Sequence, residues 1–142
     1  MRILVDNDVV LDVLLKRHPF YSESRKIFSF AASERIEIFI ATITAVNAFY
    51  TIRKEQDKDL AFEAIEGLSK LVAVCRTAPS VLLTAISLNF RDFEDAVQCA
   101  SAIAEGLDAI VTRNKRDFAK SPLPVYSPAE FIELLSPAAG AG

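Results

Sequence analysis

The sequence predicts an α/β fold: a doubly wound α/β/α sandwich around a central parallel sheet of four or five strands. Short apolar segments rich in β-branched residues alternate along the chain with longer segments whose apolar residues recur at helical spacing. The first short segment, Ile3 to Val5, is apolar throughout, which is typical of a strand buried on both faces. We therefore expect helices on both sides of the sheet.

The strands are predicted from these short apolar segments. Pro124 precedes the last of them and removes a backbone donor, so that strand should lie at an edge of the sheet. The predicted strands span residues 3–5, 36–41, 71–74, 109–111 and 125–126.

Helices are predicted between the strands from periodicity, with Pro near several starts. Thr42 or Thr44 suits the N-cap of the third helix, and Gly106 suits the end of the sixth. In the second, which Pro19 opens, Phe20, Ile27, Phe28 and Ala31 should share a face. The predicted helices cover residues 9–14, 19–31, 44–55, 59–69, 79–88, 92–105 and 128–135.

Length and composition fit one globular domain. The chain has 142 residues, of which 51% are hydrophobic, and we assign residues 1–136 to the domain and 137–142 to a disordered tail. Acidic residues interrupt the apolar N-terminus, and no apolar run reaches the ~20 residues of a membrane span. We expect a cytoplasmic protein without membrane contact, in which Cys75 and Cys99 are reduced core thiols.

Charge and histidine content exclude several kinds of function. The formal net charge of −3 does not favour binding nucleic acid by bulk electrostatics, so a nucleic-acid role needs a local site. A single histidine excludes acid–base catalysis by a histidine pair within one chain. That histidine, His18, precedes a proline in a loop-like segment, where nothing marks it as part of a Ser-His-Asp triad.

Carboxylates from distant segments should meet at one edge of the sheet. Asp6 ends the first strand, and Asp117 follows the fourth. Asp95 lies in the first turn of the helix that leads into the fourth strand, and this helix runs antiparallel to that strand. All three therefore belong at the carboxyl ends of the strands, where parallel sheets bind their ligands.

Such a cluster suits Mg²⁺ or Mn²⁺, because these cations prefer oxygen ligands and assist phosphodiester hydrolysis without histidine. Taken singly, each acid also fits helix capping: Asp6 as an N-cap, and Asp92 with Asp95 or Asn114 with Asp117 as capping-box pairs. Together, the acids would repel one another unless a cation or bound protons compensated. We interpret Asp8 and Asp12 as solvated or loop-facing, and Asp92 and Glu94 as charges of the helix start.

Polar and basic residues flank the proposed acids. Asn7, Thr112 and Asn114 could orient water or hydrogen-bond a carboxylate, and turn and capping roles explain them equally well. The basic residues of the same loop could meet an RNA backbone, although a solvated loop is the favoured interpretation. These basic residues are Arg113, Lys115 and Arg116.

Four segments resemble the PIN domain family, whose best-known bacterial members are VapC-like toxin ribonucleases. The similarity covers nearly the whole chain, and the last two segments, taken together, are the most specific. The segments are Ile3–Asp12, Ile43–Asn47, Asp92–Ala96 and Val111–Phe118.

The resemblance implies a metal-dependent endoribonuclease, often dimeric and often neutralised by an antitoxin. Of the family's four acids, the first falls on Asp6, the third on Asp95 and the fourth on Asp117. The second, usually Glu, falls on Asn47, which can offer a neutral oxygen but no charge. Asn47 also fits the third position of a helix capped by Thr44. Hydrolysis would leave a 5′-phosphate and a 3′-hydroxyl, with Mg²⁺ or Mn²⁺ as cofactor and RNA as substrate.

Two other functions stay open. The departure at Asn47 is compatible with a PIN-like domain that has lost activity and binds RNA or a protein. An acyl or glycosyl hydrolase using Asp95 with Asp117 is disfavoured, because no oxyanion motif is visible. We also expect a homodimer, because two successive helices carry more large apolar residues than one thin domain needs: Phe20, Ile27, Phe28 and Phe30, then Phe49, Tyr50 and Ile52.

Overall fold

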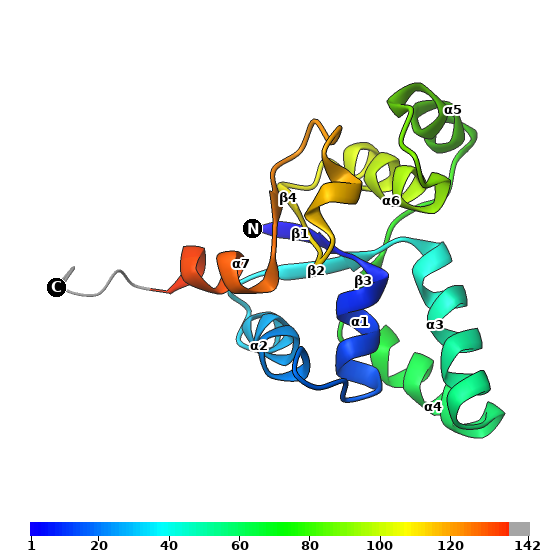
Figure 1. Ribbon diagram of the computed structural model, residues 1–142, viewed down its shortest axis with the longest axis vertical. Helices are drawn as coiled ribbons and strands as arrows, with labels where there is room; N and C mark the ends of the chain where they lie inside the picture. The colour runs from blue at the N-terminus through cyan, green and yellow to red at the C-terminus, as the bar shows by residue number, and fades with distance from the viewer. Residues whose placement is uncertain (137–142) are drawn as a thin grey trace, which may run out of the picture.

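A five-stranded parallel sheet organises the protein, seen in a computed structural model that describes residues 1–136 (Figure 1). The strand order is β3-β2-β1-β4-β5, and every neighbouring pair is parallel, which confirms the doubly wound sheet predicted from the sequence. The predicted tail at 137–142 lies outside the described residues. The strands are β1 (Arg2–Val5), β2 (Glu37–Ile40), β3 (Ala73–Val74), β4 (Ala109–Val111) and β5 (Val125–Tyr126).

Seven α-helices and one 3₁₀ helix, η1, connect the strands in the described chain. Every segment predicted to be helical contains a helix, and Gly106, with a φ of 68°, follows the end of the sixth as expected. The helices are α1 (Asn7–Leu14), α2 (Tyr21–Ala32), α3 (Thr42–Glu55), α4 (Lys58–Ser69), α5 (Pro79–Leu88), α6 (Phe93–Ala104), η1 (Lys115–Phe118) and α7 (Pro128–Leu135).

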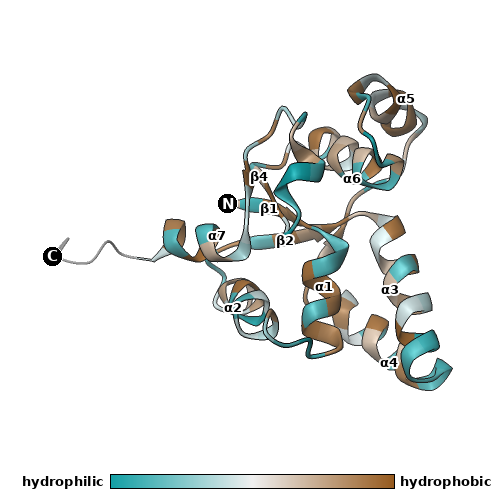
Figure 2. Cartoon of the chain, viewed as in Figure 1, coloured by the Kyte–Doolittle hydropathy of each residue, from teal (hydrophilic) through white to brown (hydrophobic). Residues whose placement is uncertain are grey.

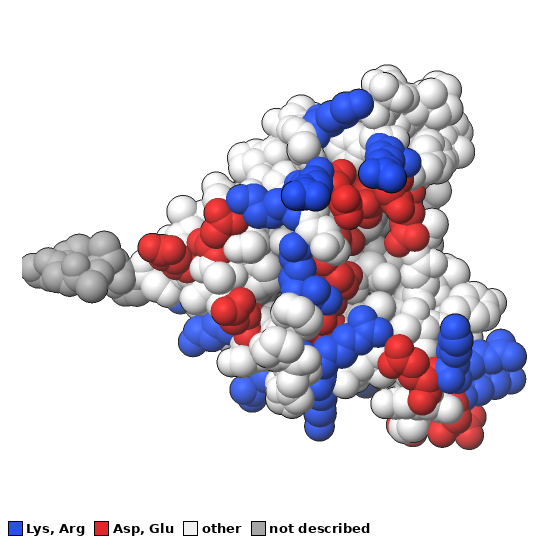
Figure 3. Space-filling view, in the orientation of Figure 1, with Lys and Arg blue, Asp and Glu red and all other residues white. Residues whose placement is uncertain are grey.

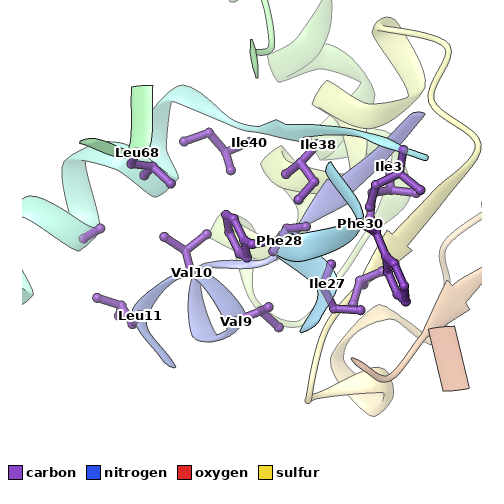
Figure 4. Close-up of a cluster of buried hydrophobic side chains, with 14 of the residues drawn as sticks. Ile3, Val9, Val10, Leu11, Ile27, Phe28, Phe30, Ile38, Ile40 and Leu68 are labelled. Carbon is purple, nitrogen blue, oxygen red and sulfur yellow. The ribbon is translucent and has the colours of Figure 1, made fainter. Parts of the chain in front are cut away.

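Alternating side chains of the strands pack under helices on both faces of the sheet. Ile3 and Val5 face a large core with residues of α1, α2, α3, α4 and α7, part of which Figure 4 shows. Leu4 points the other way, toward Cys99 of α6 and Phe118 of η1. Helix α5 packs on α6, outside that second layer (Figure 1). Both faces of the central strands are therefore buried, as predicted.

The starts of α2 and α3 differ from the sequence prediction in the residues that open and cap them. Helix α2 begins at Tyr21, with an exposed Phe20 at its N-cap, so Pro19 precedes the helix. Helix α3 begins at Thr42 after Ala41, which forms no side-chain cap. Neither Thr42 nor Thr44 is the N-cap, because the chain turns into α3 directly after β2. The hydroxyl of Thr44 is buried and bonds elsewhere.

The core takes up most of the large apolar residues that motivated the dimer prediction. Only Phe20 and Tyr50 of that set are markedly exposed, at 39% and 58%. Most of these residues therefore pack inside the chain and leave no apolar surface for a second copy to cover. Those buried in the core are Ile27, Phe28, Phe30 and Ile52.

The two cysteines are buried and unoxidised, as predicted. Burial raises the pKa of the Cys75 thiol to about 12, which keeps it protonated and unreactive. Within residues 1–136, no helix combines the length and apolar character needed to cross a bilayer.

Candidate metal centre

The carboxyl ends of β1 and β4 create the site. Val5 pairs with Val111 at the ends of these neighbouring strands, and the backbone N–H of Asp6 extends the pairing by donating to the Val111 carbonyl over 3.0 Å. The chain then leaves the sheet in two directions, into α1 after Asp6 and into a loop after Thr112. The side chains of Asp6 and Thr112 consequently meet at this edge.

Asp6 is buried, with 5% of its surface exposed, and both its carboxylate oxygens are engaged. Its Oδ1 accepts from the Asn7 backbone N–H at 2.7 Å and from Gln98 Nε2 at 2.8 Å, and its Oδ2 accepts from Thr112 Oγ1 at 2.7 Å. Burial raises the pKa of Asp6 despite these hydrogen bonds, and the charge of Asp117 adds to the effect. Asp6 also caps α1, as its alternative interpretation proposed.

Asp95 joins the same network from the first turn of α6. Gln98 Nε2, which donates to Asp6, also lies 3.5 Å from Asp95 Oδ1. Burial raises the pKa of Asp95 to about 7, and the charges of Asp6, Asp92, Asp117 and Glu94 contribute in that order. Acids from the start, the middle and the end of the sequence thus lie within electrostatic reach of one another.

Asp117 lies in η1, where its side chain is exposed. With Arg91 and Asp92 it lines a cavity of about 270 Å³ beside the start of α6. Figure 3 shows acidic side chains gathered over this part of the molecule, with Lys and Arg side chains around them. The three predicted acids are therefore brought to one rim, with Asp6 buried at its base and Asp117 open to solvent.

Comparison with known proteins identifies the family of the chain. The PIN domain pattern matches residues 2–116, which is most of the chain. The chain belongs to the PIN domain family. It is 23% identical to Ribonuclease VapC1 of Aquifex aeolicus (strain VF5) over 137 residues, which cover 93% of this chain and 94% of that protein.

Solved structures share the fold of this PIN domain. The VapBC2 complex of Rickettsia felis, bound to a promoter DNA fragment, contains a chain that matches with a TM-score of 0.71 and 16% identity, covering 89% of this chain and 98% of the other. VapBC-1 of nontypeable Haemophilus influenzae also gives a TM-score of 0.71 and 16% identity, with coverages of 91% and 99%. At these identities the similarity establishes the architecture.

Gln98 and Thr44 are site residues of this PIN domain that the sequence reasoning missed. Both are fully buried, and Thr44 Oγ1 donates to Gln98 Oε1 over 3.3 Å. Gln98 can therefore present its amide N–H groups to Asp6 and Asp95. The available signal was one long polar residue on the inward face of α6, a turn after Asp95, where its neighbours Ala96 and Ala100 are apolar and buried.

The three residues expected to support the acids have different roles. Thr112 Oγ1 donates to Asp6 and accepts from the Asn114 backbone N–H at 3.0 Å. The Asn114 side chain instead donates to Asp8 Oδ2 at 2.9 Å, and its predicted capping of Asp117 is wrong because it forms no side-chain cap to η1. Asn7 supports Asp6 through its backbone, while its Oδ1 is buried without a hydrogen-bond partner in the described chain.

Asp8 and Asp12 were expected to be solvated or loop-facing, and the second alternative holds, because both bond to the loop after β4. Asp12 is completely buried, accepts from Ser24 at 3.0 Å, and pairs with Arg113 through two bonds of 2.8 and 3.2 Å. Asp8 accepts from the Arg113 backbone at 3.1 Å, and burial, followed by the charge of Asp6, raises its pKa to about 7. Placement one turn apart on α1 lets both acids hold the loop after β4.

Arg113 is correspondingly not part of a solvated loop. Its guanidinium carbon lies 3.8 Å from the centroid of the Phe20 ring, and its side chain is 24% exposed. Lys115, the first residue of η1, pairs with Glu130 of α7 at 2.8 Å. Arg116 remains exposed, as expected.

Asn47 lies beside Glu94. Because α3 begins at Thr42, Asn47 falls in its second turn and is not the third residue of a helix capped by Thr44. Burial raises the pKa of Glu94, while hydrogen bonding by the Asn47 side chain opposes the shift and the charges of Asp92 and Asp6 add to it. Asp92 is the N-cap of α6, as predicted, with its Oδ1 accepting from the Asp95 backbone at 3.1 Å. Glu94 lies in the first turn of α6, as predicted.

The donor set fits a hard divalent cation. Asp6, Asp95 and Asp117 supply only oxygen. Burial raises the pKa of Asp6 and Asp95, the charges of neighbouring acids add to the shift, and a cation would relieve both effects. Within residues 1–136, no three His, Cys, Asp or Glu side chains are gathered closely enough to form a complete metal-binding set. Mg²⁺ needs only one or two carboxylates, because it keeps several waters.

Proposed function

We propose that this PIN domain is an Mg²⁺- or Mn²⁺-dependent endoribonuclease that acts as the toxin of a toxin–antitoxin pair. The observation that carries the proposal is the acidic network of Asp6, Asp95 and Asp117 at the carboxyl edge of the sheet, with raised pKa values at the first two. The relative named Ribonuclease VapC1 supports the reaction class. The similarity to chains in VapBC complexes and in a toxin–antitoxin complex from Klebsiella pneumoniae supports the biological role.

In this proposal Asp6, Asp95 and Asp117 hold the metal, and Asn47 assists as a neutral ligand or holds water. A bound divalent cation neutralises phosphate charge and makes a water molecule more acidic. Thr112 and Gln98 fix the Asp6 carboxylate from two sides, so that its geometry does not depend on the metal. Attack of water on phosphorus leaves a 5′-phosphate and a 3′-hydroxyl.

We also propose a homodimer, an antitoxin partner and a cytoplasmic site of action. The observation that supports the dimer is the exposure of apolar side chains on α5. Leu82, Leu83 and Ile86 are 52%, 69% and 64% exposed. Figure 2 shows that hydrophobic residues make up much of α5. Light scattering that gave the mass of a single chain at high concentration would remove the dimer.

The experiment that tests the nuclease compares the parent with Asp6→Asn on RNA, with and without Mn²⁺. Loss of one buried ligand charge should reduce metal-dependent cleavage about 100-fold or more. Asp59→Asn, at an exposed position in the first turn of α4, is the matched control and should cleave like the parent.

Cleavage that survives in Asp6→Asn contradicts this assignment. Absence of cleavage in the parent supports the second candidate, a PIN domain that binds RNA or a protein without cutting. The neutral Asn47 at the position of an expected acid is the observation that favours this alternative.

A further inference from the structure

Arg91 lies in the turn that joins α5 to α6, beside the acidic rim. With Asp92 and Asp117 it lines the cavity of about 270 Å³ at the start of α6. Figure 3 shows Lys and Arg side chains around the acidic ones on this face. A ligand that reaches Asp117 through this cavity therefore also meets the guanidinium of Arg91.

The turn that carries Arg91 is anchored to the segment around η1. The Nζ of Lys120 donates to the backbone carbonyl of Asn89 over 2.8 Å. The ring of Phe90 packs edge-to-face against Phe118 of η1, with the ring centroids 5.9 Å apart, and Phe118 is buried in the core. These two contacts fix the residues just before Arg91 against the 3₁₀ helix that also carries the third proposed acid.

The residue after Arg91 is fixed as well, whereas Arg91 itself is exposed. Asp92 caps α6, with its Oδ1 accepting from the Asp95 backbone over 3.1 Å. In the described part of the chain no ion pair includes Arg91, although Arg113 and Lys115 are both paired with carboxylates. The cavity therefore has a permanently charged guanidinium that is available to an anionic ligand.

We propose that Arg91 binds a phosphate group of the RNA and so holds the RNA backbone beside Asp117. This inference rests on the proposed function for its substrate class, but it does not require a bound metal. The planar guanidinium offers paired N–H donors that match the oxygens of a phosphate. A chain with a net charge of −3 has to attract RNA through such local contacts, because its total charge opposes binding.

The salt dependence of RNA binding tests this contact. Fluorescence anisotropy of a short labelled single-stranded RNA, with a chelator present to prevent metal-dependent cleavage, gives the affinity at several salt concentrations. Each phosphate contact with a single strand adds about 0.7 to the slope of log affinity against log salt concentration. Arg91→Ala should lower that slope by about 0.7 and weaken binding at low salt at least about threefold.

Arg53→Ala is the matched control, because it removes the same charge from an exposed position elsewhere. Arg53 lies in the last turn of α3, a 14-residue helix that begins at the carboxyl edge of the sheet and ends away from it. This variant should keep the slope of the parent. Thermal unfolding checks that both variants are folded before the titrations.

Three results would overturn the inference. In the first, Arg91→Ala binds RNA with the slope and affinity of the parent. In the second, Arg53→Ala loses as much as Arg91→Ala, which would show that RNA responds only to total charge. In the third, the parent does not bind the RNA. Failure of the nuclease is seen separately: if the parent cuts no RNA with Mn²⁺ but shows the Arg91 effect, the enzyme is removed and the phosphate contact stands.

Discussion

At the individual acids of the site, burial disfavours the charged form of the carboxyl group, whereas hydrogen bonds favour it. Asp6 receives three hydrogen bonds, which favour its charged form, yet its pKa is raised because the loss of solvent outweighs them. Asp95 has weaker support, since its closest side-chain donor is the 3.5 Å contact with Gln98. The metal-free protein therefore tends to hold protons where a cation would bind.

The raised pKa of Asp95 predicts that the stability of the folded chain depends on pH. Burial and neighbouring carboxylates raise the pKa of Asp95 to about 7, whereas an Asp in an unfolded chain titrates near about 3.9. Between about pH 4 and 7 the folded chain binds the proton more tightly, so its stabilising contribution is full below about pH 4 and is lost as the pH rises through about 7. Asp95→Asn should remove this contribution.

Urea unfolding in the presence of a chelator, at about pH 5 and about pH 8, provides the measurement. The free energy of unfolding should decrease less toward pH 8 in Asp95→Asn than in the parent. Equal changes in the two proteins would show that Asp95 titrates as an ordinary exposed carboxyl.

At the residue scale, the sequence predicted the acids and one partner of Asp6, Thr112, but not the other side-chain partners. Asp6, Asp95 and Asp117 could be found because strand ends and helix starts are visible in the pattern. Gln98 and Asp12 could not, because a buried polar side chain is acceptable only when a partner from a distant segment is present. Nothing local to either residue identifies that partner.

The loop between β4 and η1 is held by α1 rather than by its own turns. Arg113 reaches the buried Asp12 with two hydrogen bonds, packs against Phe20, and donates its backbone N–H to Asp8. The same loop carries Asn114 and leads to Asp117. The ion pair thus connects the start of the chain to the segment that completes the site.

Removal of Arg113 should be much more damaging than removal of the neighbouring Arg116. Arg113→Ala leaves Asp12 charged and buried without its partner, which should lower the free energy of unfolding by about 3–5 kcal/mol. Arg116→Ala, at an exposed position in η1, should change it by no more than about 0.5 kcal/mol. Urea denaturation of both variants at neutral pH compares them, and similar losses would mean that the ion pair does not hold the loop.

At the element scale, the sequence predicted which segments form strands and helices better than where they end. The first helical turn of α3 was assigned to a cap because Thr is a good N-cap residue, but the hydroxyl of Thr44 is used by Gln98 instead. The third strand is shorter than predicted, because only Ala73 and Val74 find a partner in β2. Contacts with distant segments therefore determine where α3 begins and how long β3 is.

Across the whole molecule, strand order is what assembles the site. β1 lies at the centre of the sheet between β2 and β4, so that the segments following these strands begin side by side (Figure 1). Asp6, Thr112 and the start of α3 are brought together in this way. The parallel sheet could be predicted from alternating strands and helices, whereas the strand order required the structure.

The central claim is that Asp6, Asp95 and Asp117 together hold one divalent cation. A crystal soaked in Mn²⁺ and measured for anomalous scattering tests it directly, because the scattering locates manganese without assumptions about the ligands. We predict a peak at the carboxyl edge of β1, between the side chains of Asp6 and Asp95 and within reach of Asp117. A peak elsewhere, or none at this edge while the carboxylates point apart, would contradict the account.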